Sequence, residues 1–267
     1  EVHEHGKLVL QDHATGAYAL QKLPLGSRSY GVTGIHLDNQ GAVWISLYLG
    51  GVCRWDGGGH YTCLAGPDDT RFEGHAVTDI VDTGDGRYWI ATLESGLYRW
   101  DPRVKDNAVE HFKQDLKNPD SLGDDAISAL SVDKHGVLWI ALQSAGLDRL
   151  APFGRKSDPV FQHYRVADGL PSDTVYGLEP DEFGNLWLAT AHGLSRFHTA
   201  DGKIQNFDEE QGAQNLDFNF GAHFTTRDGY IVLGGAGGLN RFRPADVNDI
   251  DRKSTRLNSS HIPLSRM

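Results

Sequence analysis

The sequence is poor in several features that would each point to a particular class of protein. No apolar run approaches the ~18 residues that a membrane-spanning helix needs, so no segment is expected to cross a membrane. Only 25 Lys and Arg residues stand against 36 Asp and Glu residues, which gives a net charge of −11. An acidic surface repels phosphate backbones, so the sequence argues against nucleic acid as a partner.

Helical periodicity and the common catalytic motifs are missing as well. No segment repeats its apolar residues every 3.6 positions, which argues against helices. The sequence has no Gly-x-Ser-x-Gly elbow, no His-Glu-x-x-His, no Walker loop and no Cys-x-x-Cys. We therefore expect no catalytic residues, no cofactor and no bound metal.

What the sequence does contain is a repeat that is marked by tryptophan. Successive copies lie 45, 50 and 48 positions apart, at Trp44, Trp89, Trp139 and Trp187. Each tryptophan follows an Asp and a Gly in a shared phrase, such as Asp133-Lys-His-Gly136-Val-Leu-Trp139-Ile. A fifth, weaker copy has Ile231 in the tryptophan position. Repeats of this length indicate a solenoid or a propeller.

Each copy divides into four short strands. An alternating apolar segment such as 127–132 precedes the Asp-x-x-Gly turn, which suits a tight hairpin. The tryptophan strand follows, and then a third strand that begins with Gly and carries an arginine. These arginines are Arg54, Arg99, Arg149, Arg196 and Arg241. The fourth strand carries a polar–aromatic pair, which is His60-Tyr61, His111-Phe112, His163-Tyr164 or Asn206-Phe207.

Four strands in every copy are typical of a β-propeller blade. A β-sandwich also has many short strands, but it has no reason to repeat one phrase five times. We therefore predict an all-β β-propeller with five full four-stranded blades and half of another. Residues 1–24 are predicted to be the outer strands of a truncated preceding blade, and 25–250 the propeller repeats. Residues 251–267 share no repeat and are basic, so we interpret them as a non-native tail.

These phrases resemble the two-component regulator propeller repeat, whose pattern is Asp-x-x-Gly-x-x-Trp-Ile-x-Thr followed by Gly-Leu. Thr92 and Thr190 match its Thr, whereas Leu142 departs from the pattern. The linker Asp168-Gly-Leu-Pro-Ser-Asp173-Thr-Val is similar to the connection between blades in that family. The segment from 215 to 244 resembles the family's final blade. The resemblance covers about residues 6–246.

The resemblance implies a function and a setting. It implies the periplasmic or extracytoplasmic sensor part of a membrane-anchored bacterial receptor. A β-sandwich module, a membrane helix and a kinase or cyclase output domain usually follow in such receptors. As partners we expect a polar small molecule or an oligosaccharide, the following β-sandwich module and, in the parent receptor, a second copy in a homodimer. Family propellers commonly have seven blades, so the predicted blades fit an incomplete seven-bladed ring.

Two loop sets at one end of the propeller are the predicted ligand site, because loops from several blades converge there. One set joins the second strand to the third, and the other set joins successive blades. Their side chains are polar or aromatic and suit a sugar or another polar ligand. The first set supplies Tyr48, Glu94, Gln143 and His192, and the second Tyr30, His75, Asp125, Asp173 and Asn219. The alternative for each residue is that it only caps its own loop.

The recurring arginines also allow two interpretations. They could form an anion-binding ring, but the third strand lies far from the axis of a propeller. We favour a structural role, with the stem packed on the next blade and the guanidinium in solvent.

Three functions remain open from the sequence. The first is a non-catalytic sensor propeller. The second is a propeller enzyme of the lyase or lactonase type that acts on a polar or carbohydrate substrate. The third is a structural propeller whose surface mediates contacts. Fold alone does not separate them.

The two cysteines are predicted to form a disulfide. Cys53 falls on the third strand of the first full blade and Cys63 on the fourth. If Asp56 faces His60 across the glycine-rich turn, an antiparallel register also places Cys53 opposite Cys63. Such pairs have Cα atoms close enough for a disulfide. An oxidising compartment would keep that bond, whereas cytosol would reduce it.

Overall fold

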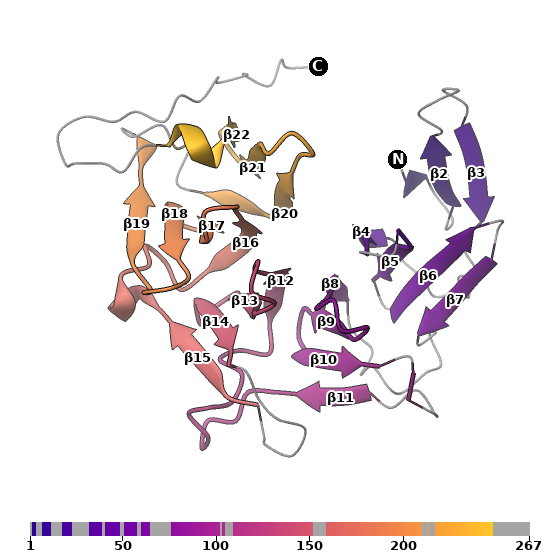
Figure 1. Ribbon diagram of the computed structural model, residues 1–267, viewed down its shortest axis with the longest axis horizontal. Helices are drawn as coiled ribbons and strands as arrows, with labels where there is room; N and C mark the ends of the chain where they lie inside the picture. Colours follow the sequence, from indigo (N-terminus) through magenta and orange to yellow (C-terminus); the bar gives the residue numbers. More distant parts are fainter. Residues whose placement is uncertain are drawn as a thin grey trace. The chain divides into compact units, whose positions relative to one another are not determined.

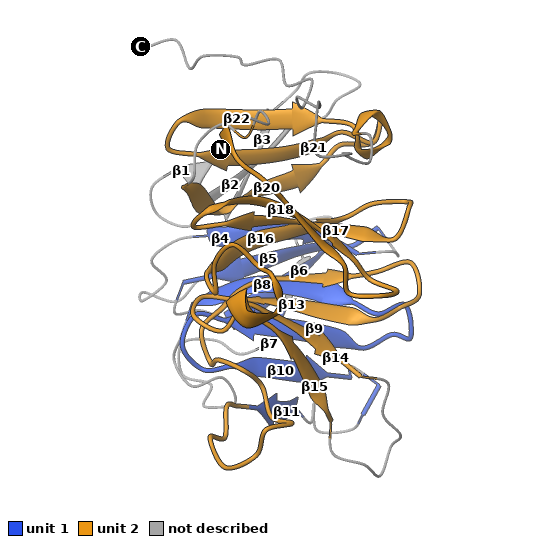
Figure 2. Ribbon diagram, turned by 90° about the vertical axis from the view of Figure 1, so that its left-hand side faces the viewer, with its two compact units in different colours: residues 1–112 blue, residues 113–267 orange. Residues whose placement is uncertain are grey.

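The computed structural model describes 13 segments of the chain, separated by short gaps. They are residues 2–3, 7–11, 18–22, 32–38, 41–48, 51–57, 60–64, 76–101, 103–104, 109–151, 159–209, 213 and 217–247. The chain forms two compact units, residues 1–112 and residues 113–267 (Figure 2). The predicted tail at 251–267 lies outside the described residues.

Unit 1 holds three antiparallel sheets (Figure 1). The first sheet is β1 (Val2–His3), β2 (Lys7–Gln11) and β3 (Tyr18–Lys22). Blade 1 is β4 (Val32–Leu37), β5 (Val43–Leu47), β6 (Gly51–Gly57) and β7 (His60–Leu64). Blade 2 is β8 (Val77–Asp82), β9 (Tyr88–Thr92), β10 (Leu97–Trp100) and β11 (Val109–Phe112).

Unit 2 holds three more blades. Blade 3 is β12 (Ile127–Val132), β13 (Leu138–Leu142), β14 (Leu147–Leu150) and β15 (Phe161–Tyr164). Blade 4 is β16 (Val175–Pro180), β17 (Asn185–Thr190), β18 (Gly193–His198) and β19 (Ile204–Phe207). Blade 5 is β20 (Phe218–Thr225), β21 (Ile231–Gly235) and β22 (Gly238–Phe242). Two 3₁₀ turns, η1 (Val166–Asp168) and η3 (Pro244–Asp246), complete it.

The predicted all-β fold of antiparallel propeller blades is confirmed. Four blades have four strands, and blade 5 has three among the described residues. In unit 2 the first strands of the three blades, β12, β16 and β20, lie next to one another in sequence order. The described residues contain no α-helix.

The Asp-x-x-Gly phrase folds as predicted, and its aspartate has a second role. Asp133 Oδ1 accepts hydrogen bonds from the backbone of the turn, including Val137 N at 3.0 Å. Its Oδ2 accepts the indole N–H of Trp139, also at 3.0 Å. Asp38 and Asp181 hold their own tryptophans in the same way. The six-residue spacing therefore satisfies a buried indole that no backbone group would reach.

Each of these tryptophans packs on the next blade of its unit. Trp139 meets Phe197 of blade 4 edge-on, with ring centroids 5.2 Å apart. Trp187 meets Phe242 of blade 5 at 4.6 Å, and in unit 1 Trp44 meets Trp100 of blade 2 at 5.6 Å. All of these tryptophans are buried, so the repeated phrase is the packing surface between neighbouring blades.

The arginines of the third strand have a structural role, although their packing partner differs from the prediction. In blades 1 to 4 the arginine lies directly across the ladder from the tryptophan of its own blade. The Cζ of Arg149, for example, lies 5.7 Å from the centroid of the Trp139 ring. Arg54, Arg99 and Arg196 repeat the arrangement at 6.0, 5.4 and 5.9 Å. A cation over an indole is favourable, and here it also covers the aromatic ring.

One position at the centre of each four-stranded blade joins the third strand to the fourth, and its chemistry differs in every blade. Blade 1 has the pair Cys53–Cys63, and blade 2 has Tyr98–His111. Blade 3 has Asp148–His163, and blade 4 has Ser195–Asn206. The four pairs are a disulfide, a ring stack at 4.0 Å, a carboxylate–imidazole contact at 2.6 Å and a hydrogen bond at 2.7 Å. We call this position the cross-strand pair.

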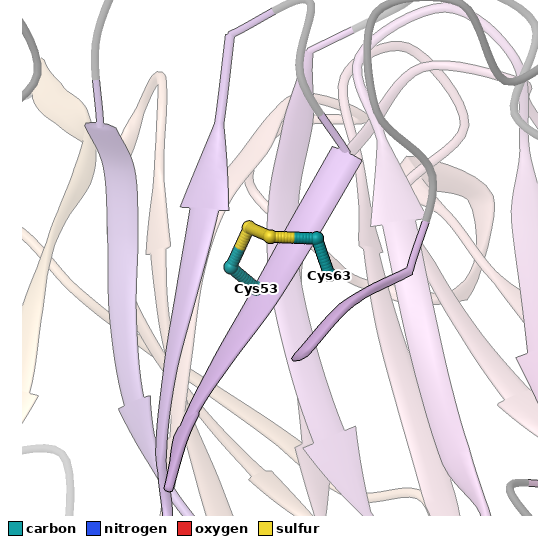
Figure 3. The surroundings of a disulfide bond; sticks show 2 residues. All are labelled: Cys53 and Cys63. Atoms are coloured by element: carbon teal, nitrogen blue, oxygen red, sulfur yellow. A yellow bond between two sulfur atoms is a disulfide. The ribbon is translucent and has the colours of Figure 1, made fainter. Parts of the chain in front are cut away.

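Blade 1 corrects two details of the sequence analysis. The cross-strand pair aligns Cys63-Leu64, and not His60-Tyr61, with His111-Phe112. In addition, Gly57 and not Asp56 faces His60, because the register shifts after Trp55. Cys53 and Cys63 nevertheless face each other and form a disulfide with Cα atoms 4.0 Å apart (Figure 3).

Candidate functional site

The two predicted loop sets lie side by side in each blade that the structure describes there. The residue that follows the second strand donates its N–H to the residue that precedes the first strand of the same blade. This bond joins Gln143 to Ala126 at 3.0 Å and Ala191 to Thr174 at 3.1 Å. It recurs from Leu93 to Ala76 in blade 2 and from Ala236 to Asp217 in blade 5.

In unit 2 three of these loops meet around the linker that leads into blade 4. Gly146 of the blade 3 loop donates its N–H to the Asp173 carbonyl at 2.7 Å, and Ala191 contacts the neighbouring Thr174. The loops that carry Gln143, Asp173 and His192 therefore converge. Of these side chains, Gln143 and Asp173 are half-buried and His192 is exposed.

Two predicted acids hold their own loops. Asp173 Oδ1 accepts the backbone N–H of Val166 at 2.7 Å, which fixes η1. Asp125 Oδ1 accepts the backbone N–H of Gln114 at 2.7 Å. One oxygen of each carboxylate therefore caps its own loop, as the alternative interpretation expects.

The other predicted residues are placed as follows. Tyr48 and Glu94 are exposed in unit 1, and Asn219 is exposed on β20 of unit 2. Tyr30 and His75 lie outside the described residues. The proposed ligand role of the nine residues stays a prediction.

Asp148 is a buried carboxylate that the sequence analysis did not select. It lies on β14, has no exposed surface, and accepts the Gly123 N–H at 2.8 Å. His163 donates Nδ1–H to it at 2.6 Å and Nε2–H to the Pro119 carbonyl at 2.9 Å. A carbonyl can only accept, so Nε2 of His163 carries a proton.

These contacts change the pKa values of both groups. Burial raises the pKa of the Asp148 carboxyl, against the opposing effect of its hydrogen bond from His163. The hydrogen bond to Asp148 raises the pKa of His163, against the opposing effect of burial. Because the pair also contacts Gly123 and Pro119, it ties the linker between blades 2 and 3 to blade 3. We interpret it as a structural element.

Two further polar contacts join neighbouring blades. Tyr88 of blade 2 donates its hydroxyl to Asp38 of blade 1 at 3.1 Å, and burial together with this carboxylate raises the pKa of Tyr88 to about 12. His223 on β20 donates Nδ1–H to Glu179 on β16 at 2.7 Å. Both contacts hold blades together within their unit.

A cleft that sequence reasoning missed lies between blades 3 and 4, with a volume of about 550 Å³. It lies at the end of the strands opposite to the predicted loops, because its walls include the turn between β12 and β13. The facing wall is the turn between β18 and β19. Its lining residues are Asp133, His135, Val137, Arg149, Tyr164, Thr199, Ala200, Asp201 and Gly202.

The described residues contain no group of three or more His, Cys, Asp or Glu side chains that could hold a metal ion. No helix among them is long and apolar enough to span a membrane.

Comparison with known proteins bears on two features of the chain, the class of its fold and the family of its repeat. The blades are those of a β-propeller. The family described as two component regulator propeller matches residues 169–192, which run from the linker into β16 and β17 of blade 4. The resemblance recognised in the sequence is thereby confirmed at this repeat. No curated protein sequence matches the chain.

Solved structures share the fold at low identity. The extracellular domain of a putative hybrid two component system, BT3049 from B. thetaiotaomicron, is 20% identical with a TM-score of 0.63. The match covers 80% of this chain and 28% of that one. PorZ, a surface component of the type-IX secretion system of Porphyromonas gingivalis, is 17% identical with a TM-score of 0.64. This match covers 84% of this chain and 34% of PorZ, so the chain spans about a third of each protein.

A putative gluconolactonase is also similar, with 16% identity and a TM-score of 0.57. The match covers 84% of this chain and 76% of that one. At these identities the likenesses establish the fold alone.

Proposed function

We propose that this chain is part of the extracytoplasmic sensor of a bacterial signalling receptor, and that it binds a polar small molecule without catalysis. The observation that carries the proposal is the two component regulator propeller match at residues 169–192. The extracellular receptor domain among the similar structures is in accord with it. Ligand binding would change the contacts between this chain and a following β-sandwich module, in a receptor that works as a homodimer.

The disulfide between Cys53 and Cys63 supports the extracytoplasmic location. Disulfides persist in oxidising compartments and are rare in cytosol, where thiols stay reduced. Cys53 is buried on β6 and Cys63 is exposed on β7, so reductant can reach the bond from one side. A cytosolic chain would therefore lose this link between the two strands.

The site that we propose for the ligand is the loop end of unit 2, around the linker that contains Asp173. Half-buried Gln143 and exposed His192 flank it, and one oxygen of the Asp173 carboxylate is free of the η1 contact. Amide, imidazole and carboxylate groups suit the hydroxyls of a sugar or oligosaccharide. Glu94 occupies the corresponding loop of blade 2 in unit 1.

Two other functions compete with this proposal. A lyase or lactonase would need a converging acid and base or a metal cage, and only fold-level likeness to a putative gluconolactonase favours it. A structural propeller would need neither a ligand nor a reaction. Binding and turnover measurements separate all three.

The experiment uses the purified chain and its Gln143→Ala, His192→Ala and Glu182→Ala variants. Glu182 is an exposed acid in a turn at the opposite end of blade 4 and serves as the control. Binding of mono- and oligosaccharides is followed by calorimetry, and turnover is measured on esters, lactones and polysaccharides. We expect binding without turnover, and a loss of about tenfold in affinity in the first two variants, equivalent to ~1.4 kcal/mol.

Turnover that disappears with Gln143→Ala or His192→Ala would establish the enzyme instead. Absence of binding together with a concentration-dependent dimer would favour the structural propeller. Equal loss of binding in Glu182→Ala would move the site away from the loops.

A further inference from the structure

The cleft between blades 3 and 4 is bounded on one side by the turn from β18 to β19, which covers residues 199–203. The turn from β18 to β19 closes tightly, with His198 donating its N–H to the Lys203 carbonyl at 2.8 Å. Gly202 permits the turn with a φ of +70°. Arg149 on β14 and Tyr164 on β15 also line the cleft. The volume of about 550 Å³ lies within the ~300–1,000 Å³ of small-molecule sites.

The two carboxylates in the cleft are already engaged with donors. Asp133 accepts two backbone N–H groups on one oxygen and the Trp139 indole on the other. Asp201 binds Lys203 Nζ at 2.6 Å and His198 Nδ1 at 2.7 Å. Hydrogen bonds from Lys203 and then His198 hold the pKa of the Asp201 carboxyl well below its usual range. Both oxygens of Asp133 are therefore occupied by neutral donors, and the charge of Asp201 is balanced by Lys203.

The groups that remain without partners are donors. Arg149 donates one Nη1–H to Gln162 Oε1 at 2.8 Å, while its Nη2 makes no hydrogen bond to the described residues. Its Nε is buried and has no partner there either. Neither the Tyr164 hydroxyl nor the His135 ring forms a hydrogen bond within the described part of the chain; the Tyr164 ring is fixed against Phe197 at 4.7 Å.

Arg149 differs in this respect from the same position of blade 2. There Arg99 forms an ion pair with Glu110 on the neighbouring strand, which neutralises its charge. The partner of Arg149 is the neutral Gln162, so its positive charge is uncompensated by the ladder. The Trp139 ring and Gln162 hold the guanidinium in one orientation. A fixed guanidinium with unused N–H groups is well suited to a carboxylate.

We propose that this cleft binds the carboxylate of a small hydroxylated molecule, with Arg149 as the anchor and Tyr164 and His135 as additional donors. The Thr199 hydroxyl donates to the Gly184 carbonyl at 2.9 Å, so its oxygen is left to accept from a ligand hydroxyl. This site is separate from the loop end, and the inference does not depend on the proposed sensor role.

The test compares ligands that differ in a carboxylate. Glucuronate is paired with glucose, gluconate with glucitol and tartrate with threitol, and binding to the full chain is measured by calorimetry. We expect each bound carboxylate to exceed its neutral counterpart by at least tenfold in affinity. Arg149→Lys keeps the charge but loses the planar donor pair, and should cost about tenfold or more. Arg196→Lys is the matched control, because Arg196 stacks on Trp187 in the same way and does not line the cleft.

Tyr164→Phe provides a second variant that removes a hydroxyl without a hydrogen bond in the described protein. It should weaken carboxylate binding while leaving the melting temperature unchanged. The proposal is overturned if no carboxylate of the panel binds, or if the neutral counterparts bind equally well. It is also overturned if Arg149→Lys and Arg196→Lys weaken binding to the same extent.

Discussion

Exchanging the cross-strand pair of blade 1 for that of blade 4 measures what the disulfide contributes to stability. The disulfide joins residues 10 positions apart. For a loop of this length the chain-entropy model gives roughly 2.7 kcal/mol at 25 °C. The double variant Cys53→Ser, Cys63→Asn removes that constraint and introduces the hydrogen-bonded pair found at Ser195–Asn206. A hydrogen bond of this kind recovers about 1 kcal/mol.

Thermal unfolding followed by near-UV circular dichroism provides the measurement. In a chain of this size ~1 kcal/mol corresponds to ~2–4 °C, so Cys53→Ala, Cys63→Ala should lower the melting temperature by ~5–10 °C. Cys53→Ser, Cys63→Asn should lie ~2–4 °C above the double alanine variant. Reductant should lower the melting temperature of the wild-type chain and leave both variants unchanged.

The reasoning is refuted if reductant leaves the wild-type melting temperature unchanged. Two free thiols on denatured, unreduced protein that was exported to the periplasm would refute it as well. If the two double variants melt together, the hydrogen bond of blade 4 does not substitute at this position.

Three further predictions concern single features of unit 2. Asp133→Ala removes the partner of a buried indole and should cost ~2–3 kcal/mol in urea unfolding, whereas a loss below ~0.5 would contradict this role. Gly146→Ala should destabilise by ~2–4 kcal/mol in the same assay, because φ is +79° and a Cβ would lie 2.2 Å from the Tyr164 carbonyl oxygen; a neutral result would contradict that geometry. The raised pKa of His163 makes its contribution to stability complete below ~6.5 and lost as pH rises through the folded-state value. Asp148→Ser, His163→Asn should therefore flatten the fall of the melting temperature between pH 6 and 9, and an unchanged slope would exclude the pair as its source.

The blades could be predicted because a tryptophan recurs at the surface where neighbouring blades pack. Tryptophan is rare and must be buried with its N–H satisfied, so an aspartate six positions earlier recurs with it. The fourth strand was harder to align. Blade 1 uses Cys63 at the cross-strand pair where blade 3 uses His163, and His60 suggested a false match. Because the cross-strand pair has different residue types in every blade, residue type does not identify this position in the sequence.

The recurring arginines of the third strand are a second feature that could be predicted only in part. Their regular occurrence correctly indicated a structural role, but spacing along the chain does not say which ring a long side chain covers. The cross-strand register decides it, because Arg149 faces Trp139 directly. In blade 5 the register places Val232 opposite Arg241, and the guanidinium covers a different ring, with its Cζ 3.4 Å from the centroid of Tyr230.

The cleft could not have been predicted from the repeat, because it depends on what differs between the copies. The connection between β14 and β15 covers residues 151–160, whereas only residues 199–203 connect β18 to β19. A longer turn in blade 4 would have room to fill the space beside Tyr164, and a glutamate in place of Gln162 would neutralise Arg149 as Glu110 does for Arg99. Arg54 and Arg196 also face uncharged residues, Thr62 and Gln205, so Glu110 of blade 2 is the exception among these positions. The repeat constrains its tryptophan, its aspartate and its cross-strand pair. The length of the turns and the sequence of the fourth strand can therefore vary from blade to blade. A binding site can arise between two blades in this way without disturbing the others.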